Sequence, residues 1–215
     1  MEKKYKLTEE TINVGGTALY RIEALRDFGD VKKGDKGGFI EKESNLSQSG
    51  DCWVYDDAKV YSSSIVYGDA KVCDNARVYD NAIVTDHAKV YNNAMVYGYA
   101  RVYANANIYG DALVHGKANV SGNAMVCDNT KIFGNAEVYD DAIIESTSDY
   151  IVFKNWWSSG RYFTWTKSNN MWKVGCFYGT GEELIEKAYK DSEKSGREYE
   201  RVVRYVESII KDYHK

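Results

Sequence analysis

Three histidines and four cysteines are the side chains of this 215-residue sequence best suited to acid–base or nucleophilic chemistry. His87 lies in the run Thr-Asp-His-Ala, His115 follows Val114, and His214 is next to the last residue. Imidazole accepts and returns a proton near neutral pH, so His87 and His115 are the candidate catalytic residues. Neither has a partner that the sequence reveals, and the simpler interpretation of both as ordinary surface histidines is favoured.

The cysteines and the acidic residues give no stronger signal. The four cysteines are scattered singly, without the close pairs that are typical of metal sites, and Cys176 has no base beside it. Carboxylates recur at turn positions and carry the oxygen atoms that calcium prefers, but Asp and Asn in turns more often satisfy backbone groups. The sequence therefore predicts no metal site and no cofactor.

These side chains are positioned by a six-residue repeat that runs from Asp57 to Ile144. A small residue returns at every sixth position, and a β-branched aliphatic residue follows two places later, as in Ala70 and Val72. Positions two apart on a strand point to the same side, so each such pair is directed inward and its neighbours outward. The intervening Gly, Asp and Asn carry turn chemistry. The period excludes a helical stripe and a propeller blade, and a plain antiparallel meander does not require such constant spacing.

The run Val-Tyr-Gly-Asp-Ala-Lys at residues 66–71 resembles the hexapeptide repeat of left-handed parallel β-helix proteins, in which three hexads form one triangular coil. Fifteen hexads imply five coils, and Ile40, Leu46 and Cys52 keep the phase upstream and imply a sixth. The expected fold class is thus mainly β, a left-handed parallel β-helix, with the handedness implied by the resemblance alone. Tyr in place of Gly after the aliphatic residue makes the chain more similar to phage- and prophage-encoded members than to housekeeping acyltransferases.

Three segments are predicted: an N-terminal β-hairpin cap with the entry to the first coil (1–50), the β-helix (51–146), and a C-terminal α+β module (147–215). The module should contain strands at 150–152, 161–166 and 171–176, the last two joined as a hairpin by a turn at 168–170. Two helices should follow, opened by capping boxes at Thr180-Gly-Glu-Glu and Ser195-Gly-Arg-Glu. The module also resembles one that accompanies such repeats in phage proteins. No biochemical activity follows from that resemblance.

Outward side chains eighteen residues apart should stack in ladders along the β-helix. The predicted binding surface is one ladder with its neighbours, consisting of Tyr61, Tyr79, Met95, Tyr97, Leu113, His115 and Phe133. Two further ladders contain Tyr55, Cys73, Tyr91, Tyr109 and Cys127, and Tyr67, Thr85, Tyr103, Ser121 and Tyr139. Tyrosine offers a large rigid area with a polar tip, which suits an interface. Stacking that only stabilises the coil explains the ladders equally well.

The composition excludes several classes of partner. The net charge is −4 with acidic and basic residues interspersed, so neither nucleic acid nor an anionic membrane is a predicted partner. The sequence shows no signal peptide and no apolar run that could span a bilayer, and the scattered cysteines suit a reducing compartment. The expected location is the cytoplasm, that of the host if a phage encodes the chain.

Two functions remain. The favoured one is a non-catalytic, phage- or prophage-derived protein that binds a protein partner, such as a host or defence component that it inhibits, and forms a homodimer or homotrimer. The alternative is a trimeric acyltransferase that uses acetyl-CoA, for which the resemblance implies a histidine at a cleft between subunits and a long loop that interrupts the repeat. No loop interrupts these hexads, so no pocket wall is evident. The sequence therefore predicts no acetyl-CoA binding.

Overall fold

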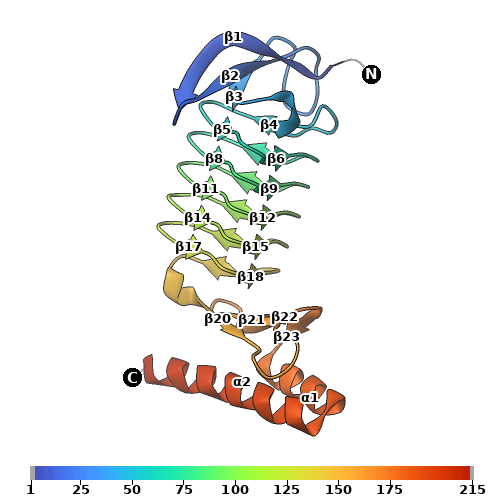
Figure 1. The fold of residues 1–215 in the computed structure, drawn as a ribbon, viewed down its shortest axis with the longest axis vertical. Coiled ribbons are helices and arrows are strands. Elements are labelled where there is room, and N and C mark those ends of the chain that lie inside the picture. Colours follow the sequence, from blue (N-terminus) through green and yellow to red (C-terminus); the bar gives the residue numbers. More distant parts are fainter. Residues whose placement is uncertain (1–2, 214–215) are drawn as a thin grey trace.

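The computed structural model describes residues 3–213 and is an elongated β-solenoid closed by a different structure at each end (Figure 1). An antiparallel sheet lies at the N-terminal end, and a second antiparallel sheet with two helices lies at the C-terminal end. Between them the chain winds through about six coils. The prediction of a parallel β-solenoid is confirmed, whereas its left-handed sense stays a prediction.

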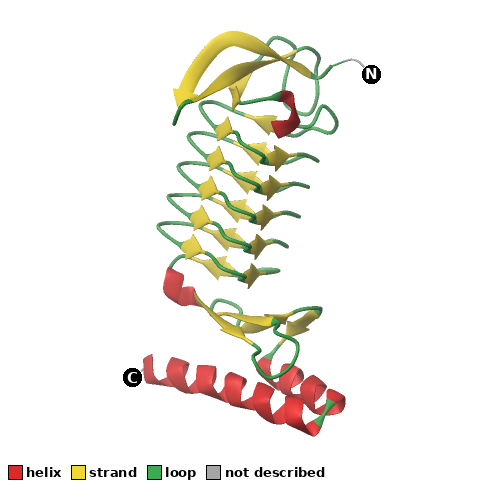
Figure 2. Ribbon diagram, viewed as in Figure 1, coloured by secondary structure: helices red, strands yellow, loops and turns green. Residues whose placement is uncertain are grey.

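From the second coil on, each coil places one short strand on each of three faces (Figure 2). Face 1 continues from β3 (Lys36–Ile40) through β5 (Lys59–Val60), β8 (Arg77–Val78), β11 (Met95–Val96), β14 (Leu113–Val114) and β17 (Lys131–Ile132). Face 2 contains β6 (Ile65–Val66), β9 (Ile83–Val84), β12 (Arg101–Val102), β15 (Asn119–Val120) and β18 (Glu137–Val138). Face 3 contains β4 (Trp53–Val54), β7 (Lys71–Val72), β10 (Lys89–Val90), β13 (Asn107–Ile108), β16 (Met125–Val126) and β19 (Ile143–Ile144).

The inward columns of small and aliphatic residues form the solenoid core, as the repeat predicts. Ala94 and Val96 have no exposed surface, and Val96 lies in register between Val78 and Val114 of the neighbouring coils. Burying one valine side chain stabilises the fold by on the order of 2 kcal/mol. Since every coil repeats the same pair, the core is a stack of equivalent layers.

The corners between faces turn through residues with positive φ, which explains the recurrence of Asp, Asn and Gly there. Asp74 has φ +57°, and its carboxylate accepts a 2.8 Å hydrogen bond from the backbone N–H of Asn92 one coil further on. Asp80 and Asp86 do the same for Gly98 and Ala104. These carboxylates thus satisfy turn backbone. Within residues 3–213, no group of three or more His, Cys, Asp or Glu side chains is arranged to hold a metal ion.

The first coil has a different register from the predicted one. Ile40 pairs with Val60 and Leu46 with Val66, both twenty residues on, whereas Val54 pairs with Val72, eighteen residues on. Two extra residues therefore lie between Leu46 and Val54. As a result Ile40 and Leu46 occupy the aliphatic column, not the small-residue column that their phase predicted.

The N-terminal end is covered by a curved hairpin of β1 (Tyr5–Val14) and β2 (Thr17–Ala24), and β2 pairs antiparallel with β3. A 3-10 turn (Glu43–Asn45) follows β3. The rings of Tyr5 and Phe28 meet Trp53 edge-on at 6.0 and 5.3 Å. Trp53 stands in an outward column of face 3, and this cover contributes to its burial, which leaves it 1% exposed. The hairpin and the loop at residues 25–35 therefore share one core with the solenoid.

The C-terminal module has one strand more than the three that the sequence predicts. A 3-10 turn (Thr147–Asp149) leads into β20 (Tyr150–Lys154), β21 (Tyr162–Thr166), β22 (Met171–Val174) and β23 (Phe177–Gly179), which form one antiparallel sheet. Helices α1 (Gly181–Asp191) and α2 (Glu193–Tyr213) pack against it. The capping box of Thr180 and Glu183 is confirmed. The one predicted at Ser195 is wrong, because α2 already begins at Glu193 and the Ser195 N–H donates to the Ser192 hydroxyl instead.

Side-chain hydroxyls meet the last strand of every face. The N–H of Lys131 on face 1 donates to Thr147, that of Glu137 on face 2 to Thr164, and that of Ile143 on face 3 to Ser168, at 3.3, 2.9 and 2.8 Å. In the coils above, the equivalent N–H groups donate to a carbonyl of the next coil. The module therefore replaces a missing seventh coil with three hydroxyl acceptors.

Candidate functional site

His87 lies at the corner before face 3, beside a carboxylate that the sequence analysis did not connect with it. Asp69 occupies the same corner one coil earlier, and its Oδ2 lies 3.5 Å from His87 Nδ1. The other oxygen, Oδ1, accepts a 3.0 Å hydrogen bond from the Asp51 N–H. The contact places a carboxylate on the Nδ1 side of the ring and leaves Nε2 on the other side, an arrangement that general-base histidines share.

The corner borders a groove of about 480 Å³ that has a wall outside the repeat. Its floor is formed by face 3 and the corner residues, and its wall by Gly29 and Asp30 of the N-terminal loop. Asp30 reaches down to face 3, where its carboxylate accepts from Lys71 Nζ at 2.9 Å and from the Tyr55 hydroxyl at 2.8 Å. These hydrogen bonds, that from Lys71 first, lower the pKa of the Asp30 carboxyl. The predicted absence of a pocket wall is therefore wrong, because the N-terminal segment supplies one.

The groove contains one uncompensated cation. Lys71 is paired with Asp30, whereas the ammonium of Lys89, one coil further on, has no ion-pair partner in the described part of the chain. The carboxylates of Asp51 and Asp69 line the same groove, so Lys89 is a local point of positive charge to which a phosphate group could bind. The side chain of His87 is 68% exposed, so a substrate can reach its ring directly from solvent.

His115, the other candidate, is placed quite differently. Its ring stacks between Tyr97 at 4.8 Å and Phe133 at 5.8 Å on face 1, so both of its faces are covered. Burial, and then the nearby charge of Lys131, lower the pKa of His115. His115 is therefore one of the stacked rings of the aromatic ladder on face 1. His214 lies outside the described residues.

The predicted binding surface is gathered on face 1. Tyr61, Tyr79 and Tyr97 stack at 5.1 and 4.9 Å with nearly parallel rings, and Met95 and Leu113 are neighbours in register beside them. The rings cover one another, so the ladder is half-buried except for Phe133, which is 50% exposed at its lower end. Binding by this surface stays a prediction.

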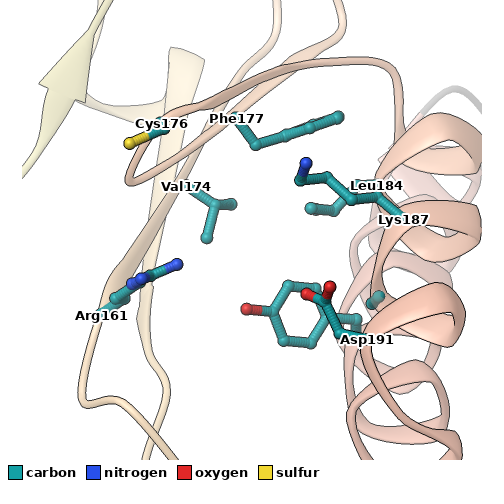
Figure 3. A pocket seen from close by; sticks show the side chains of 9 residues that line it. Arg161, Val174, Cys176, Phe177, Leu184, Lys187 and Asp191 are labelled. Atoms are coloured by element: carbon teal, nitrogen blue, oxygen red, sulfur yellow. The ribbon is translucent and has the colours of Figure 1, made fainter.

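A second cavity, in the C-terminal module, has one of the cysteines among its lining residues. It has a volume of about 60 Å³ between β22, β23 and α1, which is room for about two water molecules. The sulfur of Cys176 points away from it, and Asp191 lies on its far side (Figure 3). The cavity is too small for an acyl donor, and Cys176 faces no base there.

Asp69 was not predicted because the eighteen-residue spacing was applied to the outward residues of the strands and not to the corner residues. Asp69 and His87 are eighteen residues apart, the same one-coil spacing that predicts the ladders, so the corner column could have been read in the same way. The wall at Asp30 had no such signal, since the path of the N-terminal loop is not periodic. His87 stays a candidate catalytic residue, and its role is a prediction.

Part of the repeat is similar to the repeat of a known β-solenoid protein. A family model described as the YdcK β-solenoid repeat matches residues 70–86 and 88–104, and His87 is the residue between the two segments. A protein of Escherichia coli K12 with the name "Uncharacterized acetyltransferase YdcK" is 42% identical over 62 residues. The chain is a β-solenoid repeat protein related to it.

The similarity covers only a part of each of the two proteins. The matched stretch covers 25% of this chain and 19% of the length of the Escherichia coli protein. Phage origin and inhibition of a defence component stay predictions. None of the helices in the described chain is long and apolar enough to cross a membrane.

Proposed function

We propose that this chain is an acyltransferase that uses acetyl-CoA and that its reaction takes place in the groove at His87. The observation that carries the proposal is the Asp69–His87 pair at the edge of a groove of about 480 Å³. The name of the related Escherichia coli protein supports the same class of reaction. This reverses the preference that the sequence alone suggested.

His87 is the general base of the proposed reaction. Its Nε2 takes the proton of an acceptor hydroxyl or amine as that group attacks the thioester carbonyl of acetyl-CoA. The C–S bond then breaks, and the imidazolium returns the proton to the departing thiolate. Asp69 stabilises the imidazolium and holds the ring, so it is a positioning residue that does not itself exchange a proton.

Lys89 is the proposed contact for the donor. Its ammonium is free of carboxylate partners in the part of the chain that the structure describes, and coenzyme A carries phosphates that such a charge attracts. Lys71 is already neutralised by Asp30, which makes Lys89 the better candidate of the two.

The test is titration calorimetry with acetyl-CoA, together with measurement of free thiol released in the presence of hydroxyl and amine acceptors. Wild type should give a saturable heat, and Lys89→Ala should weaken binding by about tenfold, the effect of losing one charge-assisted contact. His87→Ala should keep the heat and lose the release of thiol, and Asp69→Asn should lower kcat with unchanged affinity. His115→Ala is the matched control and should behave as wild type. No heat with wild type, or equal losses in both histidine variants, would overturn the proposal.

The second candidate is binding of a protein partner by the face 1 ladder. Its support is the continuous stack from Tyr61 to Phe133 with Met95 and Leu113 at its side. This function requires no groove and no base. Wild-type protein that gives no heat with acetyl-CoA would make it the leading candidate.

A further inference from the structure

Face 2 carries an outward column in which large and small side chains alternate. Consecutive members lie one coil apart, as the backbone hydrogen bonds from Tyr67 to Val84, from Thr85 to Val102 and from Tyr103 to Val120 show. The column reads Tyr67, Thr85, Tyr103, Ser121 and Tyr139. Face 1, in contrast, has a ring in every coil. Face 2 therefore has a ring only in every second coil.

The small side chain of Thr85 leaves room for about one ring between Tyr67 and Tyr103. Three of the four ring pairs in consecutive coils of face 1 stack at 4.8 to 5.1 Å, close to the spacing between strands. Two coils span about 10 Å, so a ring inserted over Thr85 would lie at the same stacking distance from Tyr67 and from Tyr103. Ser121, the next small residue, is only 2% exposed, so the open slot of this column is the one over Thr85.

The slot over Thr85 is an open groove in the structure. It has a volume of about 350 Å³ and is lined by Tyr67, Ile83, Thr85, Asp86, Arg101, Tyr103 and Asn119. Ile65 and Tyr67 at its upper end are among the most exposed large apolar side chains of the solenoid, at 41% and 43%. Exposed apolar area of this kind beside a shaped slot is typical of an interaction surface.

The partner that fits must present rings with the same two-coil spacing, and face 2 of a second copy does so. We propose that two copies of this chain pair through face 2 with antiparallel solenoids. A two-fold axis between β9 and β12 places Tyr103 of each copy in the Thr85 slot of the other. The same operation places the exposed ring of Tyr67 of each copy opposite the small side chain of Ser121 of the other. The contact is self-complementary, as a two-fold interface requires.

The column beside the rings is compatible with this register. Ile65 comes opposite Asn119 and Ile83 opposite Arg101, so no two like charges face each other. The aliphatic stem of Arg101 can cover Ile83 while its guanidinium stays in solvent.

The contacts of Tyr139, at the lower end of the column, favour this register over one in which Tyr139 and not Tyr67 inserts into the second copy. The ring of Tyr139 meets Tyr178 edge-on at 5.0 Å and lies 4.8 Å from the ammonium of Lys173, both from the C-terminal module. Tyr139 is therefore occupied within its own chain, whereas Tyr67 is open. The inference does not depend on the proposed acyl transfer.

Sedimentation velocity of the full chain at micromolar concentration tests the pairing. Wild type should sediment as a dimer. Thr85→Tyr fills the slot from within its own chain and should weaken the dimer by about a hundredfold, the usual cost of losing a central anchor at an interface. The same variant extends a ring stack that this fold already tolerates on face 1, so its thermal midpoint should not fall. Cys73→Tyr fills the equivalent gap between Tyr55 and Tyr91 on face 3 and is the matched control, which should remain dimeric.

A double variant tests the register. Thr85→Tyr combined with Tyr103→Ser exchanges a ring and a slot, so the two copies again place each ring opposite a small residue, and the dimer should return. Monomeric or trimeric wild type would overturn the proposal, as would a dimer that survives Thr85→Tyr or is lost in Cys73→Tyr. A double variant that stays monomeric would overturn the ring-in-slot contact.

Discussion

The solenoid and the C-terminal module are stabilised in different ways, although they share one chain. In the solenoid, each buried Ala–Val pair meets its equivalents in the coils above and below, and backbone hydrogen bonds run from each coil to the next. In the module, aromatic side chains of one sheet, such as Phe163 and Trp172, pack against Leu184 and Val203 of two helices in a separate core. The solenoid core is a sum of similar layers, so a destabilising substitution in one coil should affect the neighbouring coils. The core of the module is one irregular cluster, so the effect of a substitution there should stay within the module.

The largest expected effect is that of Val96→Asp in the fourth coil. Val96 is fully buried between Val78 and Val114, so the new carboxylate has neither water nor a partner, and the free energy of unfolding should fall by about 5 kcal/mol. Urea unfolding followed by circular dichroism measures it. Met95→Asp, on the same strand but facing outward, is the control and should cost less than about 1 kcal/mol. Similar costs for the two variants would contradict the assignment of inward and outward columns.

A smaller and more local effect is expected for Leu184→Ala in α1. Leu184 is 1% exposed in the core of the module, and its truncation should cost about 3 kcal/mol. Because that core is separate from the solenoid, tryptophan fluorescence, which the module dominates, should shift to lower urea while the β-sheet circular dichroism signal does not. Leu113→Ala on the outside of face 1 is the matched control. Coincident shifts of both signals would show that the two regions unfold as one unit.

The smallest effect concerns the join between the two regions. Thr164→Val keeps the shape of the side chain but removes the acceptor of the Glu137 N–H, and the unpaired donor should cost about 1–2 kcal/mol. Hydrogen exchange of the Glu137 amide measures it directly and should become faster. Unchanged exchange would mean that the hydroxyl does not protect this strand.

The sequence predicted the solenoid well because each six-residue repeat corresponds to one strand and one corner of the coil. Ala94 and Val96 are buried as the repeat requires, and the ladder of Tyr61, Tyr79 and Tyr97 stacks as spacing predicts. The prediction failed where the period breaks. Two extra residues before Val54 shifted Leu46 to the other column, since an insertion is invisible to a pattern that still shows apolar residues at six-residue intervals.

The candidate site was only half predictable for the same reason. The His87–Asp69 pair is periodic and could be read from an eighteen-residue spacing, but Asp30 comes from a loop whose path depends on how Phe28 packs against Trp53. In the module, the strand Phe177–Gly179 is too short and too rich in glycine at its borders to give an alternating pattern. Such features depend on packing between distant segments.

The three hydroxyls below the last coil also have a consequence for assembly. A parallel β-solenoid with an open end offers a row of N–H groups on which another chain can add its own strand, and repeated addition produces a fibril. Thr147, Thr164 and Ser168 accept from that row, but a side-chain hydroxyl has no neighbouring carbonyl and amide with which to continue the ladder. The ladder of backbone hydrogen bonds therefore ends at these hydroxyls, and another copy cannot extend it along the solenoid axis at this end.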